Sequence, residues 1–143
     1  MNRREALFAT GALLAAAGTA QAADHSHHHH DGAHPWQAVL DTAGICIEKG
    51  EVCLTHCIML LGEGDKAMAA CATSVREMLA SCRALISLAA AESKFAPRLA
   101  ALCVDVCKAC EAECKKHADK HKACKECMES CTECAKACKA KVA

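Results

Sequence analysis

The chain has 143 residues, about the length of one domain, and 53% of its side chains are hydrophobic although only 2% are aromatic. Its 17 basic and 17 acidic residues balance, which together with the scarcity of aromatic rings excludes nucleic acid as an expected partner. Cysteine is the anomaly: a short exported chain with 14 cysteines is usually a disulfide scaffold, an interpretation that the spacing of these residues disfavours.

The first segment, residues 1–22, predicts an export signal. It begins with Arg3 and Arg4, continues through a short apolar run and ends in Ala20-Gln21-Ala22. Paired arginines, a short apolar run and a small-x-small site are typical of a cleavable signal of the twin-arginine type. The run is shorter than the about 20 residues of a membrane-spanning helix, which disfavours an anchor or any stable membrane association. We therefore expect export to the periplasm of a protein that is already folded.

Residues 23–34 form a histidine-rich leader with no apolar periodicity, which predicts disorder. Its imidazoles indicate metal capture, although a solvated linker is the simpler alternative. If cleavage leaves Ala23 first, the free amine, two backbone amides and His25 could surround Cu(II) or Ni(II) in square-planar geometry.

From Pro35 onward the sequence predicts helices. Alanine, leucine, lysine and glutamate are plentiful, and Pro97 is the only later proline. A first helix is predicted from about residue 36 to 61. Gly62 follows it and is expected to serve as the left-handed cap.

Three further helices are predicted in the remainder of the chain. Asp65 is a candidate cap for the second helix, which runs to about Ala91, and Ser93 marks the approach to the third. No glycine or proline separates the third helix from the fourth. We expect a break within residues 118–122, where Asp119 is the best available cap.

The cysteines advance in steps of three and four along these helices, which places them on one face of each helix. This pattern is the core seam of a bundle, with cysteine where leucine is expected. We therefore predict an all-α protein: an antiparallel four-helix bundle over residues 35–143 with a cysteine-lined core. The cysteines on this seam are Cys46, Cys53, Cys57, Cys71, Cys82, Cys103, Cys107, Cys110, Cys114, Cys124, Cys127, Cys131, Cys134 and Cys138.

Several kinds of cysteine site fit this pattern poorly. Helical neighbours three or four apart have Cβ atoms about 5–6 Å apart, whereas a disulfide requires about 3.8 Å. No Cys-x-x-Cys motif here is followed by the histidine that haem attachment requires. Iron–sulfur clusters are usually held by irregular loops rather than by evenly phased helices. The sequence also shows no carboxylate pair, nucleophile–base arrangement or phosphate loop, so we expect no enzyme.

Buried thiolates in this number favour a soft metal ion. Cu(I) accepts two or three thiolates, whereas zinc requires a tetrahedron of four, which evenly spaced thiols along a tube are expected to supply poorly. If thiolates bridge ions, capacity approaches one Cu(I) per cysteine, on the order of a dozen ions. General detoxification of Zn or Cd is the alternative. The expected Cu(I) pairs, four residues apart, are Cys53/Cys57, Cys103/Cys107, Cys110/Cys114, Cys127/Cys131 and Cys134/Cys138.

The antiparallel order gives the predicted bundle two different ends. One end carries side chains that could bind copper, and we expect the ions to enter there: His56, Met59, Met68, His117 and His121. The opposite end carries apolar side chains that predict a plug: Val39, Ile86, Leu99 and Val142. Core packing for the methionines and a solvated face for His117 and His121 are the simpler alternatives.

These motifs resemble the copper storage proteins, a bacterial family of cysteine-lined four-helix bundles. The resemblance rests on Cys53-x3-Cys57, on Cys71 with Cys82, on Cys103-x3-Cys107-x2-Cys110-x3-Cys114 and on the five-cysteine run from Cys124 to Cys138. It implies storage of multiple Cu(I) ions on the 14 cysteines, with His56 and Met59 where copper enters. The signal resembles that of the exported branch, for which the family implies tetramers. A second apolar stripe gives independent support for a homo-oligomer: Leu40, Ile47, Leu54, Ile58 and Leu61.

Overall fold

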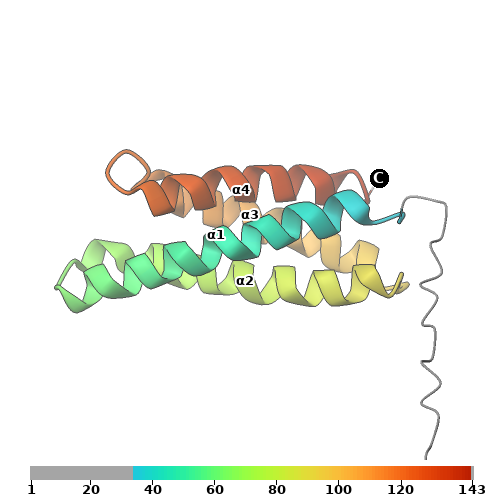
Figure 1. The fold of residues 1–143 in the computed structure, drawn as a ribbon, viewed down its shortest axis with the longest axis horizontal. Coiled ribbons are helices and arrows are strands. Elements are labelled where there is room, and N and C mark those ends of the chain that lie inside the picture. The colour runs from blue at the N-terminus through green and yellow to red at the C-terminus, as the bar shows by residue number, and fades with distance from the viewer. Residues whose placement is uncertain (1–33, 143) are drawn as a thin grey trace, which may run out of the picture. The chain divides into compact units, whose positions relative to one another are not determined.

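The computed structural model describes residues 34–142, which form four α-helices and one short 3-10 helix (Figure 1). The elements are α1 (Gln37–Gly62), η1 (Lys66–Met68), α2 (Ala69–Ala90), α3 (Ala96–Lys115) and α4 (Lys122–Lys139). The predicted all-α fold and its four helices are confirmed. The predicted signal over residues 1–22, and the histidine-rich leader apart from His34, lie outside the described residues.

The connection from α1 to α2 follows local capping signals, with one correction. Asp65 accepts a hydrogen bond from the Ala67 amide at 3.1 Å and so caps η1, which leads into α2. The left-handed residue is Gly64, with φ 96°, and not Gly62, which belongs to the last turn of α1. A backbone hydrogen bond from Asp65 to the Leu60 carbonyl closes the turn around Gly64, so the helix continues past the first glycine.

The predicted break between the third and fourth helices is confirmed, but its cap is not the predicted one. The N-cap of α4 is His121, in an extended conformation with φ −129°, rather than Asp119. The Nδ1 atom of His121 lies 2.9 Å from Nε2 of His56 on α1. A contact between distant segments therefore anchors the start of α4, which local capping preference could not reveal.

Each helix packs against two neighbours around one core. Helix α1 contacts α2 and α4, and α3 contacts the same two helices, while the diagonal pairs of these four helices do not approach closely. Consecutive helices run in opposite directions with connections at alternate ends (Figure 1). This arrangement leaves the bundle axis to side chains from all four helices.

The core along this axis is made largely of sulfur. All 14 cysteines are 0% exposed, and Met68 and Met78 are fully buried with them. Seam positions that carry no sulfur include Val75 and Gly50, both buried. The sequence prediction of a cysteine-lined core therefore agrees with the fold.

The end of the bundle where α1 begins is closed by apolar side chains. Val39 is fully buried there, and Ile86 and Leu99 pack partly buried against the core. Val142 is wrong as a plug residue: it is 43% exposed, because α4 ends at Lys139 and leaves Val142 beyond the helix. The plug is completed instead by Leu85, Ala89, Ala96 and Ala100, all fully buried.

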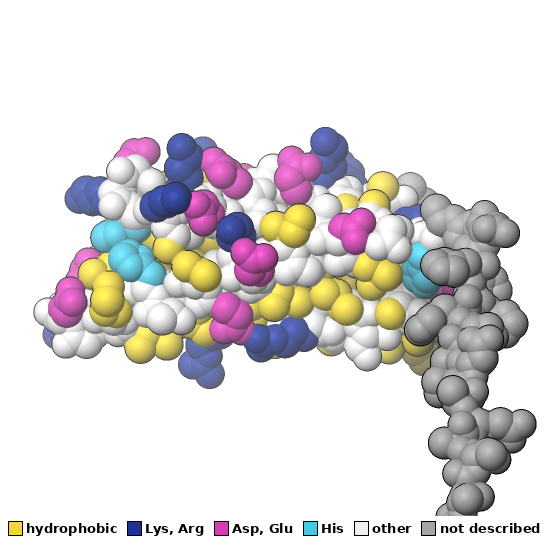
Figure 2. Space-filling view, viewed as in Figure 1, with side chains coloured by type: hydrophobic (Ala, Val, Ile, Leu, Met, Phe, Trp, Pro, Cys, Tyr) yellow, Lys and Arg dark blue, Asp and Glu magenta, His cyan; other side chains and the backbone are white. Residues whose placement is uncertain are grey.

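The outer surface carries charges of both signs with hydrophobic side chains between them (Figure 2). Within residues 34–142 no helix is at once long enough and apolar enough to cross a membrane. Most of the predicted second stripe packs partly buried against the core, because its residues flank the seam: Leu40, Ile47, Leu54 and Leu61. The apolar side chains that α1 exposes by more than half are Ile45, Val52, Ile58 and Met59.

Candidate metal centre

The 14 thiols are free and buried in the core, and many of them touch another thiol. The closest sulfur pairs lie 3.6–4.0 Å apart, beyond the about 2.05 Å of a disulfide bond and within reach of S–H···S hydrogen bonds. Because a metal ion replaces thiol protons, each contact is also a candidate ligand pair. The pairs are Cys71–Cys114 at 3.6 Å, Cys46–Cys131 at 3.7 Å, Cys53–Cys124 at 3.8 Å, Cys82–Cys107 at 3.9 Å, and Cys82–Cys134, Cys110–Cys114 and Cys110–Cys127 at 4.0 Å.

Most of these contacts join two helices, whereas the Cu(I) pairs expected from the sequence lie within one helix and stay a prediction. Among them, Cys110 and Cys114 alone lie four residues apart on one helix. Side chains at positions i and i+4 point in the same direction and keep roughly the spacing of their Cβ atoms, about 5–6 Å. Side chains from facing helices converge on the axis instead, which brings their sulfur atoms closer together.

Two groups of four thiols form compact ligand sets, in each of which all sulfur atoms lie within 4.8 Å of one another. The plug-side quartet takes one cysteine from each helix: Cys46, Cys82, Cys107 and Cys134. The histidine-side quartet lies nearer the end where α1 stops: Cys53, Cys57, Cys71 and Cys124. Two triplets connect the quartets: Cys53/Cys114/Cys127 shares Cys53 with the histidine-side quartet and Cys127 with the second triplet, Cys110/Cys127/Cys131. The second triplet reaches the plug-side quartet through the contact between Cys131 and Cys46. The sulfur atoms therefore form a continuous series along the axis.

The quartets modify the expectation that thiols along this bundle supply a tetrahedron of ligands poorly. Metal–sulfur bonds of about 2.3 Å in a tetrahedron separate the sulfur atoms by about 3.8 Å, so a quartet within 4.8 Å needs only a small contraction. Spacing along single helices did not reveal this, because each plug-side ligand belongs to a different helix. Charge still distinguishes the ions: four thiolates around Zn(II) leave two negative charges in the core, whereas one thiolate per Cu(I) leaves none.

Hydrogen bonds among the thiols make their proton affinities unequal. The hydrogen bond with Cys110, followed by those with other neighbours, lowers the pKa of Cys114 from about 9 to about 6. The hydrogen bond with Cys107, followed by those with other neighbours, lowers the pKa of Cys134 to about 5. The hydrogen bond with Cys107, together with burial, instead raises the pKa of Cys131. An arriving ion therefore meets some sulfur atoms that release a proton readily and others that hold it more tightly.

Three histidines lie at the edge of the sulfur core where α1 stops. Nε2 of His56 is 2.9 Å from Nδ1 of His121, and the His117 ring centroid is 6.5 Å from that of His121. All three side chains are partly buried, and histidine is visible on the surface near this end in Figure 2. His56 directly precedes Cys57, a member of the histidine-side quartet, in the chain.

The methionines differ in their distance from this core. Met68 is fully buried in η1 at the histidine end, whereas Met59 is 52% exposed on α1 and is not a core residue. Sequence reasoning gave no ligand role to Met78, whose Sδ lies 3.4 Å from Sγ of Cys46. Its signal in the sequence is a sulfur-bearing side chain on the seam of α2 between Cys71 and Cys82.

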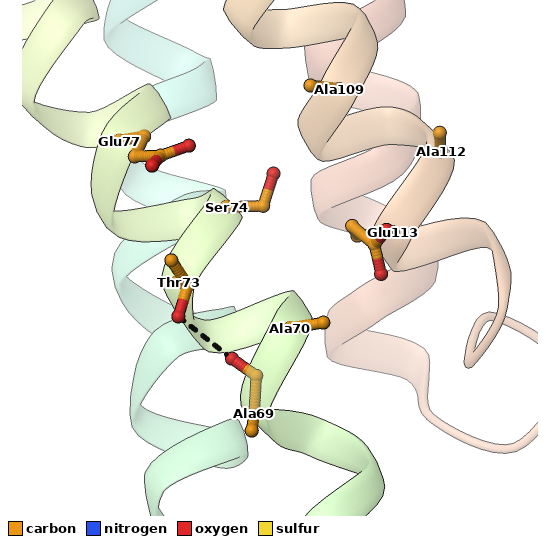
Figure 3. A pocket seen from close by; sticks show the side chains of 8 residues that line it. All are labelled: Ala69, Ala70, Thr73, Ser74, Glu77, Ala109, Ala112 and Glu113. Carbon is orange, nitrogen blue, oxygen red and sulfur yellow. Dashed lines mark hydrogen bonds between the residues drawn. The ribbon is translucent and has the colours of Figure 1, made fainter.

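Because every cysteine of the described chain is buried, its outer surface holds no comparable set of thiol ligands. A depression between α2 and α3 is lined by small side chains such as Ala70 and Ala109 and by the carboxylates of Glu77 and Glu113 (Figure 3). Cysteine, histidine and methionine are absent from its lining. The candidate metal centre is therefore the interior of the bundle.

Known proteins share this fold and sequence pattern. A family model described as copper storage protein matches residues 32–143. The uncharacterized cysteine-rich protein YhjQ of Bacillus subtilis (strain 168) is 29% identical over 107 residues, which cover 75% of this chain and 95% of that protein. The structure is similar to apo copper storage protein 3 from Bacillus subtilis, with a TM-score of 0.66, 29% identity and coverage of 75% and 98%. It is also similar to the Cu(I)-bound copper storage protein BsCsp3, with a TM-score of 0.67, 27% identity and coverage of 75% and 97%.

Proposed function

We propose that this chain, which belongs to the copper storage protein family, stores multiple Cu(I) ions on the thiolates inside its bundle. The observation that carries the proposal is a core of 14 free, fully buried thiols, 12 of which form a connected series of close sulfur groups. A solved relative of the same fold binds Cu(I), which supports the choice of ion. We assign the chain no catalytic activity, because a core saturated with bound ions leaves no open coordination position for a substrate.

Charge balance favours Cu(I) in so buried a core. Each Cu(I) that displaces one thiol proton leaves the net charge of the interior unchanged, which avoids the cost of burying an uncompensated charge. In a trigonal site with bonds of about 2.3 Å the sulfur atoms are about 4 Å apart, close to the contacts between thiols here. Bridging thiolates then allow nearly one ion per cysteine, on the order of a dozen.

An anaerobic titration of the reduced chain with Cu(I), in competition with a chelator, tests this proposal. We expect tight binding to continue well beyond the first few equivalents, with release of about one proton per ion. Saturation at one or two equivalents would contradict storage. The unloaded reduced chain, treated with a thiol-blocking reagent before titration, is the control and should bind little copper.

We place the route by which copper enters at the histidine end. His56, His117 and His121 lie beside the histidine-side quartet, Met59 offers an outer thioether, and the opposite end is filled by apolar side chains. Replacing His56, Met59 and His117 by alanine should slow loading without lowering the final capacity. His34→Ala, at the other end, is the matched control. A lower capacity with an unchanged rate would refute this route.

Binding of Zn(II) or Cd(II) is the second candidate function, because each quartet brings four sulfur atoms within 4.8 Å of one another, the number of ligands that zinc requires. The doubly negative charge of a four-thiolate site in this core favours Cu(I), so we expect about one Zn(II) per quartet, displaced by Cu(I). Titrating the reduced chain with Zn(II) and then with Cu(I) distinguishes the two functions. Retention of zinc against excess Cu(I) would favour detoxification.

The location proposed for this protein is the periplasm, on the strength of the twin-arginine pattern in residues 1–22. Fractionation of cells that express the full chain should recover a shortened protein in the periplasm. Replacement of Arg3 and Arg4 by lysine should leave it in the cytoplasm. A wild-type protein that stays cytoplasmic at full length would contradict this proposal.

A homo-oligomer, with four copies as the family implies, is proposed on the exposed face of α1. Ile45, Val52 and Met59 recur there every seven residues beside Ile58, and each side chain is more than half exposed. Contiguous apolar patches of this kind are typical of interaction surfaces. Light scattering should give the mass of a tetramer, and Val52→Glu should reduce it toward that of a monomer.

A further inference from the structure

Met78 lies on the seam of α2 where that helix carries no cysteine. It follows Cys71 by seven positions and precedes Cys82 by four, so all three share one helical face. Its side chain is fully buried among the thiols. Helix α4, by contrast, carries a cysteine every three or four residues along its length. Helix α2 therefore presents a thioether at the level where a thiol is missing.

The thioether is in direct contact with the cysteine network. The Cys46 thiol donates a hydrogen bond to Sδ of Met78 at 3.4 Å, and Sγ of Cys46 also lies 3.7 Å from Sγ of Cys131. A thioether has no proton and can only accept, so its lone pair points to the position of the Cys46 proton. An ion that replaces this proton meets the Met78 sulfur at the same place.

The neighbouring helix α1 leaves space for this side chain. Gly50, one turn after Cys46 on α1, is buried, and a Cβ atom there would lie 2.5 Å from the Met78 methyl group and 2.9 Å from a methyl carbon of Leu79. Glycine inside a helix is destabilising relative to alanine. Its presence is explained by the close approach of α2, which brings the Met78 sulfur to Cys46.

We propose that Met78 is a further copper ligand: its Sδ, with the thiolates of Cys46 and Cys131, holds one Cu(I) ion in a three-coordinate site in the bundle interior. This inference rests on the proposed storage function. Binding sends the protons of Cys46 and Cys131 to solvent and changes no oxidation state. Trigonal bonds of about 2.3 Å separate sulfur atoms by about 4 Å, so the two contacts open by only a few tenths of an ångström.

A thioether suits this position chemically. Methionine sulfur is a soft ligand that Cu(I) accepts. It adds a third donor without adding a negative charge, which a further thiolate would bring into a core sealed from water. The site therefore completes the coordination of its ion at the level where α2 offers no thiolate.

The test uses the full chain with its five methionines replaced by selenomethionine, reduced and loaded with Cu(I) without oxygen. X-ray absorption at the selenium edge should show selenium bonded to copper. The signal should fall by one bond per chain in Met78→Leu, which keeps the side-chain volume, and stay unchanged in Met128→Leu, a partly buried methionine on α4. An equal signal in wild type and Met78→Leu would overturn the proposal.

A second variant keeps the test decisive without substitution at position 78. In Met59→Leu/Met68→Leu the two methionines near the histidine end are removed, and the copper–selenium signal from Met78 must persist. Its loss there, with normal copper content, would overturn the proposal. Copper bound by the cysteines with no copper at any selenium rejects this site and leaves storage intact, whereas a reduced chain that binds no Cu(I) rejects storage as well.

Discussion

Where α1 stops, three histidines and the buried Met68 border the sulfur core, whereas where α1 begins Val39, Leu85 and small alanines fill it. The same four helices thus produce a polar end with candidate ligands and an apolar end with none. Metal ions and displaced protons are expected to pass only through the former. Position along the axis, rather than ligand type, then sets the order in which the thiols fill.

The largest effect is expected from removing a whole quartet. Alanine at all four positions of either quartet should lower capacity by about a third, since each loses four of 14 thiols. Loss of the histidine-side quartet should also slow filling of the remaining thiols, because the proposed route brings ions to it first. Stopped-flow loading and final copper content measure both effects. Equal loading rates in the two variants would show that the ends are equivalent.

Truncation in the apolar end should destabilise the protein without affecting uptake. Leu85→Ala removes a fully buried side chain and should lower the free energy of unfolding by about 2–5 kcal/mol. The loading rate should stay unchanged, because the proposed route admits copper at the histidine end. Denaturant unfolding of the reduced apo-protein gives the first quantity. Leu102→Ala, at a side chain 51% exposed on α3, is the control and should have little effect.

Acid should weaken Cu(I) binding in two stages. Each ion that displaces a thiol proton binds about tenfold more weakly for every pH unit lost. The hydrogen bond with Cys110 lowers the pKa of Cys114 to about 6, and the hydrogen bond with Cys107 lowers that of Cys134 to about 5. Near neutrality these two thiols should therefore contribute little to the number of protons released when Cu(I) binds. Below those values both protonate and the affinity should fall more steeply. In chelator competition across this range, the logarithm of the Cu(I) affinity plotted against pH should therefore be curved rather than a single straight line.

The smallest effect is expected at the turn that supports the histidine end. Asp65→Ala removes the hydrogen bond to the Ala67 amide and should lower the stability of the apo-protein by about 0.5–2 kcal/mol. Thermal unfolding measures the change. Asp105→Ala, at an exposed position inside α3, loses no such bond. An equal loss in both variants would mean that the cap contributes nothing.

The sequence predicted the helices and the inward direction of the cysteines because both depend on spacing along one helix. Steps of three and four fix the buried face, and all 14 cysteines lie there. The quartets depend instead on which residues of different helices lie at equal height. The level of a residue along the bundle axis is set by the lengths of the connections and by helix packing. The proximity of Cys46 and Cys134 could therefore not be predicted from the spacing of cysteines along each helix.

Two further details could not be predicted from local spacing, for the same reason. Leu85 and Ile86 follow Cys82 by three and by four positions, and both steps fit a helical face. Packing against α1 and α3 buried Leu85 fully and left Ile86 at the edge. Likewise the contact between His56 and His121 joins residues distant in the chain, so His121 could not be identified as the cap of α4 from local preference.

The central claim is that the buried thiols exchange their protons for many Cu(I) ions. Mass spectrometry of the intact, reduced chain under non-denaturing, oxygen-free conditions counts bound ions and lost protons together. After excess Cu(I) is removed by a chelator, we predict on the order of a dozen retained ions, each accompanied by the loss of about one proton. A chain that retains no copper, or only one or two ions, would contradict the claim.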